Sequence, residues 1–425
     1  MALYRAFQAF RPEKSKQALI PALPYDVMNS DEAKEMVKDN PYSFLHIDKA
    51  EIDLPKGTDI YSDEVYRKAK ENLENLEKTG ALIQDKKPCF YIYRQIMNGR
   101  SQTGIVGCAS IDDYMNNVIK KHEHTLAKKE EDRIRHVDTC NANTGPIFLT
   151  YRKNDIISNT VNSWANAHES VYDFVADGVN QTVWVIDDED IINTISTEFA
   201  KIDALYIADG HHRCASAVKV GQKRREEKPD YTGDEEFNFF LSVAFPDDEL
   251  EIMDYNRVVK DLNGMSREEF LSSLSHSFDV EKVETQYKPT KRHTFGMLIE
   301  NDWYKLSAKE QIIDESDPVK RLDVSILQDN LLSPILDIDD PKTNDRIDFI
   351  GGIRGLGELE RRCKEDMKLA FAMYPTSIGD LMSIADANLI MPPKSTWFEP
   401  KLLSGIFIHH LSCLLYTSDA ADDLT

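Results

Sequence analysis

The segment Asp209–Gly210–His211–His212–Arg213 gathers a carboxylate, a glycine, two imidazoles and a guanidinium within five residues. The apolar run Ala204–Ala208 before it predicts a strand, and a helix is predicted from His211 to about Arg225. A glycine at such a junction permits a sharp turn and a close approach of backbone to ligand. The first N–H groups of a helix lack intrahelical partners and carry partial positive charge, which favours an anion. The junction therefore predicts a phosphate-binding turn that uses Gly210, His211, His212 and Arg213.

The side chains of this turn have separate expected roles. The fork of Arg213 matches phosphate oxygens. Asp209 is placed either to cap the helix or to hold a metal ion. Adjacent side chains on a helix point about 100° apart, so His211 and His212 are poorly placed to share one metal. The simpler alternative is that Asp209 is only a cap and that the histidines lie on the surface.

A second polar cluster spans residues 121–145. Glu123 has the chemistry of a general base or of a magnesium ligand, although His122–Glu123–His124 lacks the spacing of an HExxH zinc site. The cations of this cluster that suit a phosphate are Lys128, Arg133 and Arg135. The alternative is a solvated charged helix over residues 120–140, with pairs such as Lys128–Asp132. The sequence leaves both interpretations open.

The composition limits the partners of the chain. Its 425 residues carry a formal net charge of −23, which argues against nucleic acid and against an anionic membrane surface. Any phosphate site must therefore be built locally from a few cations and backbone N–H groups. The six cysteines show no CxxC spacing, and no apolar run has the length of a signal peptide or a membrane span. We expect reduced thiols and a cytoplasmic protein, and the sequence does not indicate an oligomeric state.

The hydrophobic pattern indicates a mixed α/β (α+β) protein. We expect helices over residues 30–38, 60–80 and 120–140, and a hairpin of strands 90–95 and 103–109 joined through Asn98–Gly99. A second α/β block alternates helices with the strands Ala370–Met373 and Leu389–Met391. The expected domains are 1–246, with the phosphate-binding turn, and 247–410. Residues 411–425 have no continuing period and are expected to be a non-native or disordered tail.

Three smaller features are open to a structural or a ligand-binding interpretation. Pro24–Tyr25–Asp26–Val27 is a proline-containing turn with one carboxylate. Arg346 and the loop Gly351–Gly355 combine glycine with arginine but match no known phosphate-loop pattern. Met391–Phe398 offers a lysine and hydroxyls beside aromatic side chains that more often pack a core.

Several segments together resemble one bacterial and archaeal family, catalogued as domain of unknown function 1015. The resemblance covers nearly the whole chain to about residue 410. The segments that carry it are LPYDV (23–27), NPYSFLHID (40–48), KHEHT with EDR (121–125, 131–133), IADGHHR (207–213), LDVSILQ (322–328) and MPPKSTWFEPK (391–401).

The Asp-Gly-His-His-Arg segment also resembles the phosphate-binding loop of free serine kinases with a ParB/sulfiredoxin-like fold. This local resemblance implies a ParB/sulfiredoxin-like phosphate-binding core and transfer of a phosphoryl group from ATP or ADP, with Mg²⁺, to the hydroxyl of L-serine or a similar compound. It implies that Asp209, His211, His212 and Arg213 contact nucleotide phosphates or magnesium. From the second polar cluster, Arg133 is expected as a further phosphate contact. It also implies a carboxylate base upstream, for which Glu123 is the first choice and Asp26 the reserve; Glu123 and Asp209 are the expected metal ligands. The alternatives are a nucleotide-binding or nucleotide-hydrolysing regulator of ParB-like type, and a phosphatase that uses the same turn.

Overall fold

The structure is a computed structural model that describes residues 1–412. The contacts divide the chain into two compact units. Of the described residues, unit 1 comprises 1–120, 125–249 and 400–412, and unit 2 comprises 121–124 and 250–399. Among the described residues, no helix is both long and apolar enough to cross a membrane.

Unit 1 is built on a mixed nine-stranded sheet with the order β6-β11-β8-β12-β5-β4-β10-β9 and with β1 added beside β5. The pairs β6–β11 and β8–β12 are parallel, and the others are antiparallel. The strands of this sheet are β1 (Tyr4–Arg5), β4 (Phe90–Met97), β5 (Arg100–Ser110), β6 (Ile119–Lys120), β8 (Ile147–Tyr151), β9 (Tyr172–Ala176), β10 (Val179–Ile186), β11 (Leu205–Asp209) and β12 (Phe239–Pro246). Short ladders join β2 (Phe10–Pro12) to β3 (Leu82–Gln84) and β7 (Ala142–Asn143) to β21 (His409–His410).

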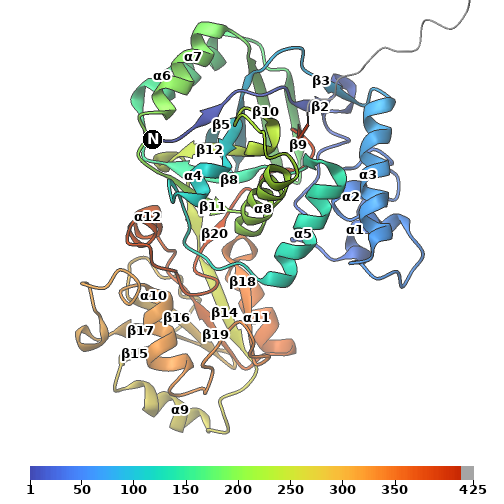
Figure 1. Ribbon diagram of the computed structural model, residues 1–425. Helices are drawn as coiled ribbons and strands as arrows, with labels where there is room; N and C mark the ends of the chain where they lie inside the picture. Colours follow the sequence, from blue (N-terminus) through green and yellow to red (C-terminus); the bar gives the residue numbers. More distant parts are fainter. Residues whose placement is uncertain (413–425) are drawn as a thin grey trace, which may run out of the picture. The chain divides into compact units, whose positions relative to one another are not determined.

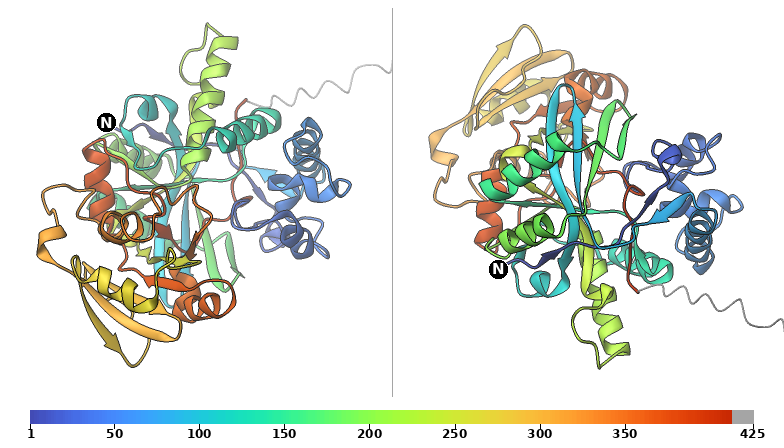
Figure 2. Two further views of the ribbon diagram at one scale, coloured as in Figure 1. Left: turned by 90° about the horizontal axis from the view of Figure 1, so that it is seen from below. Right: turned by 90° about the horizontal axis from the view of Figure 1, so that it is seen from above.

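The helices of unit 1 cover the sheet and extend it to one side. A main core forms between the sheet and the helices, with Phe240, Ile207 and Phe199 fully buried. A second core, around Phe44 and Leu73, holds α2 and α3 together at one side of the unit, where α1 also lies (Figures 1 and 2). The helices are η1 (Lys14–Lys16), α1 (Ser30–Met36), α2 (Leu45–Asp48), η2 (Ala50–Asp53), α3 (Asp63–Lys78), α4 (Ile111–Met115), α5 (Ala127–Cys140), α6 (Asp155–Ala167), α7 (Glu189–Phe199), α8 (His211–Glu227), η3 (Glu236–Asn238) and η4 (Asp247–Glu249).

Unit 2 contains an antiparallel six-stranded sheet with the order β15-β17-β16-β19-β14-β18. Leu359 of α11 packs with Val258, Leu298 and Ala370 of the sheet in one core. The strands are β13 (Ile252–Met253), β14 (Tyr255–Val259), β15 (Phe278–Val283), β16 (Thr294–Ile299), β17 (Asp302–Ala308), β18 (Ile347–Gly351), β19 (Leu369–Ala372) and β20 (Trp397–Phe398). The helices are α9 (Arg267–Leu274), η5 (Glu310–Ile312), α10 (Asp323–Leu327), the π-helix η6 (Gln328–Leu332), η7 (Gly352–Arg354), α11 (Gly355–Glu365) and α12 (Ile378–Asp386).

The mixed α/β class predicted from the sequence is confirmed, and so is the hairpin of β4 and β5. Its turn residues Asn98 and Gly99 both have positive φ, as a two-residue hairpin turn requires. The predicted division into domains 1–246 and 247–410 stays a prediction. The expected tail 411–425 falls almost entirely outside the described residues.

Two predicted elements are wrong in part. The helix expected over 120–140 begins only at Ala127. The preceding backbone makes other hydrogen bonds, because Lys120 ends β6 and the His122 carbonyl accepts the Met391 N–H at 2.9 Å. Leu389–Met391 is no strand. Asn388 has a φ of +56°, and the Leu389 N–H closes the end of α12 by donating to the Ile384 carbonyl.

Candidate functional site

The predicted phosphate-binding turn lies where β11 passes into α8 (Figure 1). Gly210 is the N-cap residue and has φ +89° and ψ 32°, a left-handed conformation that suits glycine. No side chain caps the helix, so Asp209 does not have the capping role that the sequence left open. The N-cap glycine supplies no side-chain cap, and the N–H groups and dipole of a helix start attract an anion.

Asp209 is instead held by a lysine from the end of the chain. Its Oδ2 accepts from Lys401 Nζ at 2.9 Å, and its Oδ1 accepts from the Gly210 N–H at 2.8 Å. Burial opposes ionisation of Asp209, but the charges of Lys401 and Arg213 and these two hydrogen bonds outweigh it and hold the pKa well below its usual range. Lys401 was not among the site residues expected from the sequence. Its only signal was its place at the end of the MPPKSTWFEPK segment, 192 residues from Asp209.

Arg213 is supported by main chain rather than by a carboxylate. Its Nη1 donates to the Pro146 carbonyl at 3.1 Å, and among residues 1–412 no carboxylate pairs with it. Gly145 makes room for the guanidinium: a Cβ there would lie 3.0 Å from Arg213 Nη1 and 2.8 Å from Ser404 Oγ. The charge of Arg213 also lowers the pKa of Asp209, but no direct ion pair occupies the guanidinium, so its donors can meet a ligand.

Beside this guanidinium lies a small polar pocket within unit 1. It encloses about 20 Å³, which is room for one water-sized group. A phosphoryl oxygen would fit, while the body of a nucleotide would lie outside. Its lining residues are Tyr25, Asp48, Arg133, His136, Val137, Asn143, Thr144, Gly145, Ile147 and Arg213. Four segments that carry the family resemblance thus meet in one pocket, through Tyr25, Asp48, Arg133 and Arg213.

Arg133 reaches this pocket from α5. It is 8 % exposed, pairs with Asp132 at 2.8 Å, and lies over the Tyr25 ring at 4.0 Å. Burial opposes its charge, but Asp132 and its other neighbours raise the pKa, so the guanidinium stays protonated. Arg133 and Arg213 are the two strong cations in the wall of the pocket.

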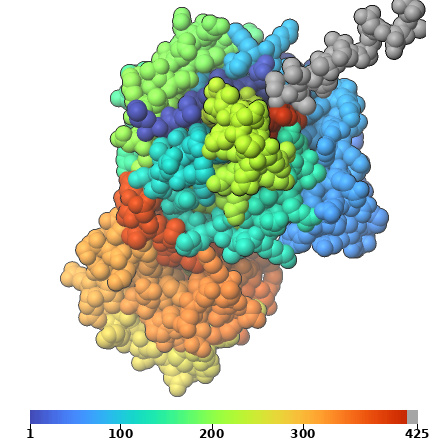
Figure 3. Space-filling model, in the orientation of Figure 1, coloured from blue at the N-terminus to red at the C-terminus, as the bar shows by residue number. Residues whose placement is uncertain are grey.

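Contacts between α5 and α8 fix the positions of the two arginines. The Ser216 hydroxyl of α8 donates to the Glu130 carbonyl at 3.1 Å, and Lys219 pairs with the Glu130 carboxylate. Farther along, Lys223 and Arg224 both pair with Asp138. The two helices lie side by side, and Figure 3 shows their teal and yellow-green surfaces in contact.

Two further polar residues of the pocket are tied to the protein itself. The Thr144 hydroxyl donates to Asp48 at 3.2 Å, and His136 Nε2 lies 3.1 Å from the Ile47 carbonyl. Burial and the nearby Arg133 lower the pKa of His136, so its imidazole is neutral near pH 7. The positive charge of the pocket therefore comes from the arginines.

The remaining predicted residues have different surroundings. His211 is 5 % exposed, and His212 Nε2 accepts the Leu126 N–H at 2.9 Å at the start of α5. Glu123 belongs to the 121–124 segment of unit 2. Asp26 is exposed and follows Tyr25, a residue of the pocket. The structure thus brings together Asp209, Gly210, Arg213 and Arg133 in unit 1.

The described residues contain no group of three or more His, Cys, Asp or Glu side chains arranged to hold a metal ion. Asp209 would have to release Lys401 before its Oδ2 met a cation. The carboxylates therefore offer no complete magnesium site of their own. Magnesium is often held by one or two carboxylates together with substrate phosphates.

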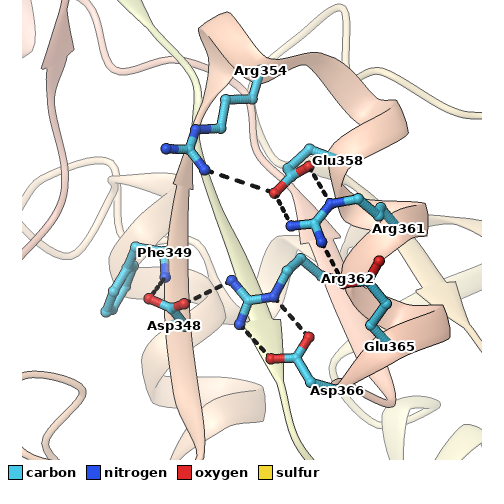
Figure 4. Close-up of polar contacts among 8 residues, drawn as sticks. All are labelled: Asp348, Phe349, Arg354, Glu358, Arg361, Arg362, Glu365 and Asp366. Carbon is cyan, nitrogen blue, oxygen red and sulfur yellow. Dashed lines mark hydrogen bonds and ion pairs between the residues drawn. The ribbon is translucent and has the colours of Figure 1, made fainter. Parts of the chain in front are cut away.

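The glycine- and arginine-containing loop before α11 differs from the turn at α8. Arg354 pairs with Glu358, and Arg346 with Asp261. Figure 4 shows that Arg361 and Arg362 are also bound to nearby carboxylates. These guanidinium groups each form an ion pair with a carboxylate, which the half-buried Arg213 does not do within the described residues.

A family model described as "Protein of unknown function (DUF1015)" matches residues 4–325. The chain belongs to this family. A comparison with curated proteins finds no significant match.

Several solved structures are similar over most of their length, at low identity. A free serine kinase in complex with AMP is 15 % identical, covering 73 % of this chain and 91 % of its own, with a TM-score of 0.36. A conserved hypothetical protein from Pyrococcus furiosus is 14 % identical, with 73 % and 97 % covered and a TM-score of 0.35. SbnI with a C-terminal truncation, from Staphylococcus aureus, is 10 % identical, with 70 % and 85 % covered and a TM-score of 0.38. At these TM-scores we base the function on the residues of the site.

Proposed function

We propose that this family member is a nucleotide-dependent kinase of a small hydroxy compound, with free L-serine as the first acceptor to test. The observation that carries the proposal is the pocket between Arg133 and Arg213, an arginine in the first turn of α8. Two guanidinium groups and a helix N-terminus form a local positive site in a chain whose net charge is −23. Such a site suits the phosphoryl group of ATP or ADP.

In this proposal, Arg213 and the first N–H groups of α8 hold the transferred phosphoryl group. Arg133 contacts an oxygen of the same group from the opposite helix, α5. Gly210 lets the backbone approach, and His211 and His212 complete the polar surroundings. Phosphoryl transfer needs positioning and charge neutralisation more than covalent chemistry, and these residues supply both.

The step requires a base for the acceptor hydroxyl. As the serine oxygen forms its bond to phosphorus, the bond to the leaving nucleotide oxygen breaks, and the serine proton passes to a carboxylate. We propose Glu123 as this base and Asp26 as the reserve. The position of Asp26 next to the pocket residue Tyr25 supports keeping it as a candidate.

Magnesium, when bound, neutralises the charge of the phosphate oxygens. We propose that it arrives with the nucleotide, whose phosphates supply most of its ligands. Asp209, paired with Lys401 and bonded to Gly210, then acts first by holding the turn in shape. Its role as a metal ligand, and that of Glu123, stay proposals.

The test is product formation by the purified full chain with ATP or ADP, Mg²⁺ and L-serine, followed by mass spectrometry. O-phosphoserine is the expected product, and E123Q and D26N compare the two candidate bases. R213A should lower kcat/KM by about 10³-fold or more, as for other phosphate clamps. The matched control is R135A, which also removes an arginine of α5. Arg135 pairs with Asp63, so its removal should leave kcat/KM unchanged.

Other outcomes would replace the proposal. Nucleotide hydrolysis that ignores serine and other hydroxy compounds would indicate a ParB-like regulator. Release of phosphate from phosphoserine without nucleotide would indicate a phosphatase. A loss below tenfold in R213A would remove Arg213 from the site.

A further inference from the structure

Unit 2 contains a cavity of its own, of about 320 Å³. This volume lies in the range of small-molecule sites. Two segments of the family resemblance form part of its wall: LDVSILQ through Val324 and Gln328, and the first part of MPPKSTWFEPK through Pro392 and Pro393. The other lining residues are Arg257, Leu332, Asp339, Asp340, Pro341, Lys342 and Phe349.

The wall of this cavity includes a buried arginine. Arg257 of β14 is 3 % exposed, and it lies opposite Phe349 of β18 in the sheet, with the guanidinium 5.6 Å from the ring centroid. Its Nη1 donates to the Tyr255 carbonyl and its Nη2 to the Lys394 carbonyl at 3.0 Å. Both partners are neutral main-chain oxygens.

No carboxylate balances this charge within the described part of the chain. Arg257 has no ion pair there, and burial lowers its pKa to about 10. Isolated buried charges are costly, so buried arginines are normally paired. Even the more exposed Arg346, Arg361 and Arg362 of the same unit each pair with a carboxylate. Arg257 therefore stands out as a buried cation at a cavity wall that needs an anion from outside the protein.

The rest of the wall indicates which anion. Asp339 and Asp340 also line the cavity; their carboxylates accept from the Ser333 hydroxyl, the Thr343 hydroxyl and the Lys342 N–H, and no cation of residues 1–412 forms an ion pair with either. Two carboxylates would repel a dianionic phosphate but would attract an ammonium group. The side chains of Val324, Leu332 and Phe349 add apolar surface. The cavity thus offers the buried guanidinium of Arg257, the ammonium group of Lys342, two carboxylates and an apolar wall.

We propose that unit 2 holds a second ligand site, for a free amino acid or a similar small zwitterion. Arg257 binds its carboxylate, Asp339 and Asp340 meet its ammonium group, and the apolar wall contacts its side chain. The fork of a guanidinium matches a carboxylate in two parallel hydrogen bonds, and the low exposure of Arg257 strengthens them. All lining residues belong to unit 2, whereas those of the kinase site that the structure brings together belong to unit 1.

The test is isothermal titration calorimetry of the full chain with the twenty common L-amino acids and three probe classes. The probes are the matching amines without carboxylate, the matching acids without amine, and inorganic phosphate. At least one amino acid should bind with one-to-one stoichiometry, and the amine and phosphate should not. R257M should weaken binding at least tenfold. The double variant D339N/D340N should weaken the amino acid about tenfold but leave the deaminated acid unchanged.

Matched variants separate this site from general damage and from the kinase site. R354M removes an exposed arginine of the same unit and should leave binding unchanged, as should R213A in unit 1. V324F keeps Arg257 but fills part of the cavity, so it should also abolish binding; it decides the matter if R257M does not fold by circular dichroism. The proposal is overturned if no amino acid binds, if binding survives in V324F, or if phosphate binds as well as the amino acids do. Loss of binding in R213A would assign the amino acid to the turn at α8 instead.

Discussion

At the scale of single residues, the turn at Asp209–Arg213 depends on two contacts that its own sequence does not contain. Arg213 lies against the Pro146 carbonyl, and Asp209 pairs with Lys401. The residue types at the strand–helix junction were sufficient to predict an anion-binding turn. Neither partner was predictable, because hydrophobic period and local spacing carry no information about contacts across 67 and 192 residues.

Gly145 gives the first prediction at this scale. In G145A the new Cβ would press on Ser404 Oγ at 2.8 Å and on Arg213 Nη1 at 3.0 Å, so the guanidinium must shift. We expect kcat/KM for phosphoserine formation to fall about tenfold, since small displacements of a positioning group have large kinetic effects. G357A is the control, because a Cβ at Gly357 meets nothing within 4 Å, and its activity should be unchanged. Unchanged activity in G145A would show that the position of Arg213 is unimportant.

Lys401 gives the second prediction. Lys401 and Arg213 lower the pKa of Asp209 against the effect of burial, so the carboxylate supports the turn down to strongly acidic pH. Because the folded-state pKa lies below the unfolded value, the stabilising contribution is present above about pH 4 and is lost as pH falls. In K401M the effect of burial on the Asp209 pKa is no longer offset by Lys401, so this pKa should rise. The acidic limb of the pH profile of kcat/KM should therefore move to higher pH. An unmoved limb would mean that Asp209 is not coupled to activity.

At the scale of elements, the sequence predicted the elements with strong local signals. The Asn98–Gly99 hairpin and the helix that starts at His211 match the structure, because turn chemistry and hydrophobic period determine them locally. The errors at residues 121–126 and 389–391 arose where the main chain makes tertiary or end-of-helix hydrogen bonds. The pocket between α5 and α8 could not be predicted, because it depends on how the two helices pack and no local sequence pattern specifies that packing.

Gly221 tests how α8 is positioned. A Cβ at this residue would lie 2.5 Å from the Phe237 carbonyl oxygen and 2.8 Å from Ile111 Cδ1, so α8 must move away from η3 and α4. We expect G221A to lower the free energy of unfolding by about 1–3 kcal/mol, as overpacking does. G357A, a glycine in α11 with open space around it, should instead raise it by about 0.5–1 kcal/mol. Urea denaturation measures the free energy of unfolding of both variants. A change of the same sign in G221A and G357A would contradict the close packing of α8.

At the scale of the whole molecule, a strongly acidic chain must attract anionic ligands through local sites. In unit 1 the site is the pair Arg133 and Arg213, and in unit 2 it is Arg257. Most arginines of the described chain, including Arg133 and those of Figure 4, pair with carboxylates, whereas Arg213 and Arg257 do not. The net charge predicted that phosphate sites must be local, and the sequence already named Arg133 and Arg213, whereas Arg257 became visible only from its burial and its partners.

The most direct test of the central claim is calorimetric titration of ADP and ATP into the wild type, R213A and R135A at fixed Mg²⁺ and salt. The account predicts binding to the wild type and to R135A, and a loss of at least tenfold in R213A. It also predicts that adenosine, which has no phosphate, binds all three proteins equally weakly. Equal nucleotide affinity in the wild type and R213A would contradict the claim that the turn at Asp209–Arg213 binds phosphate.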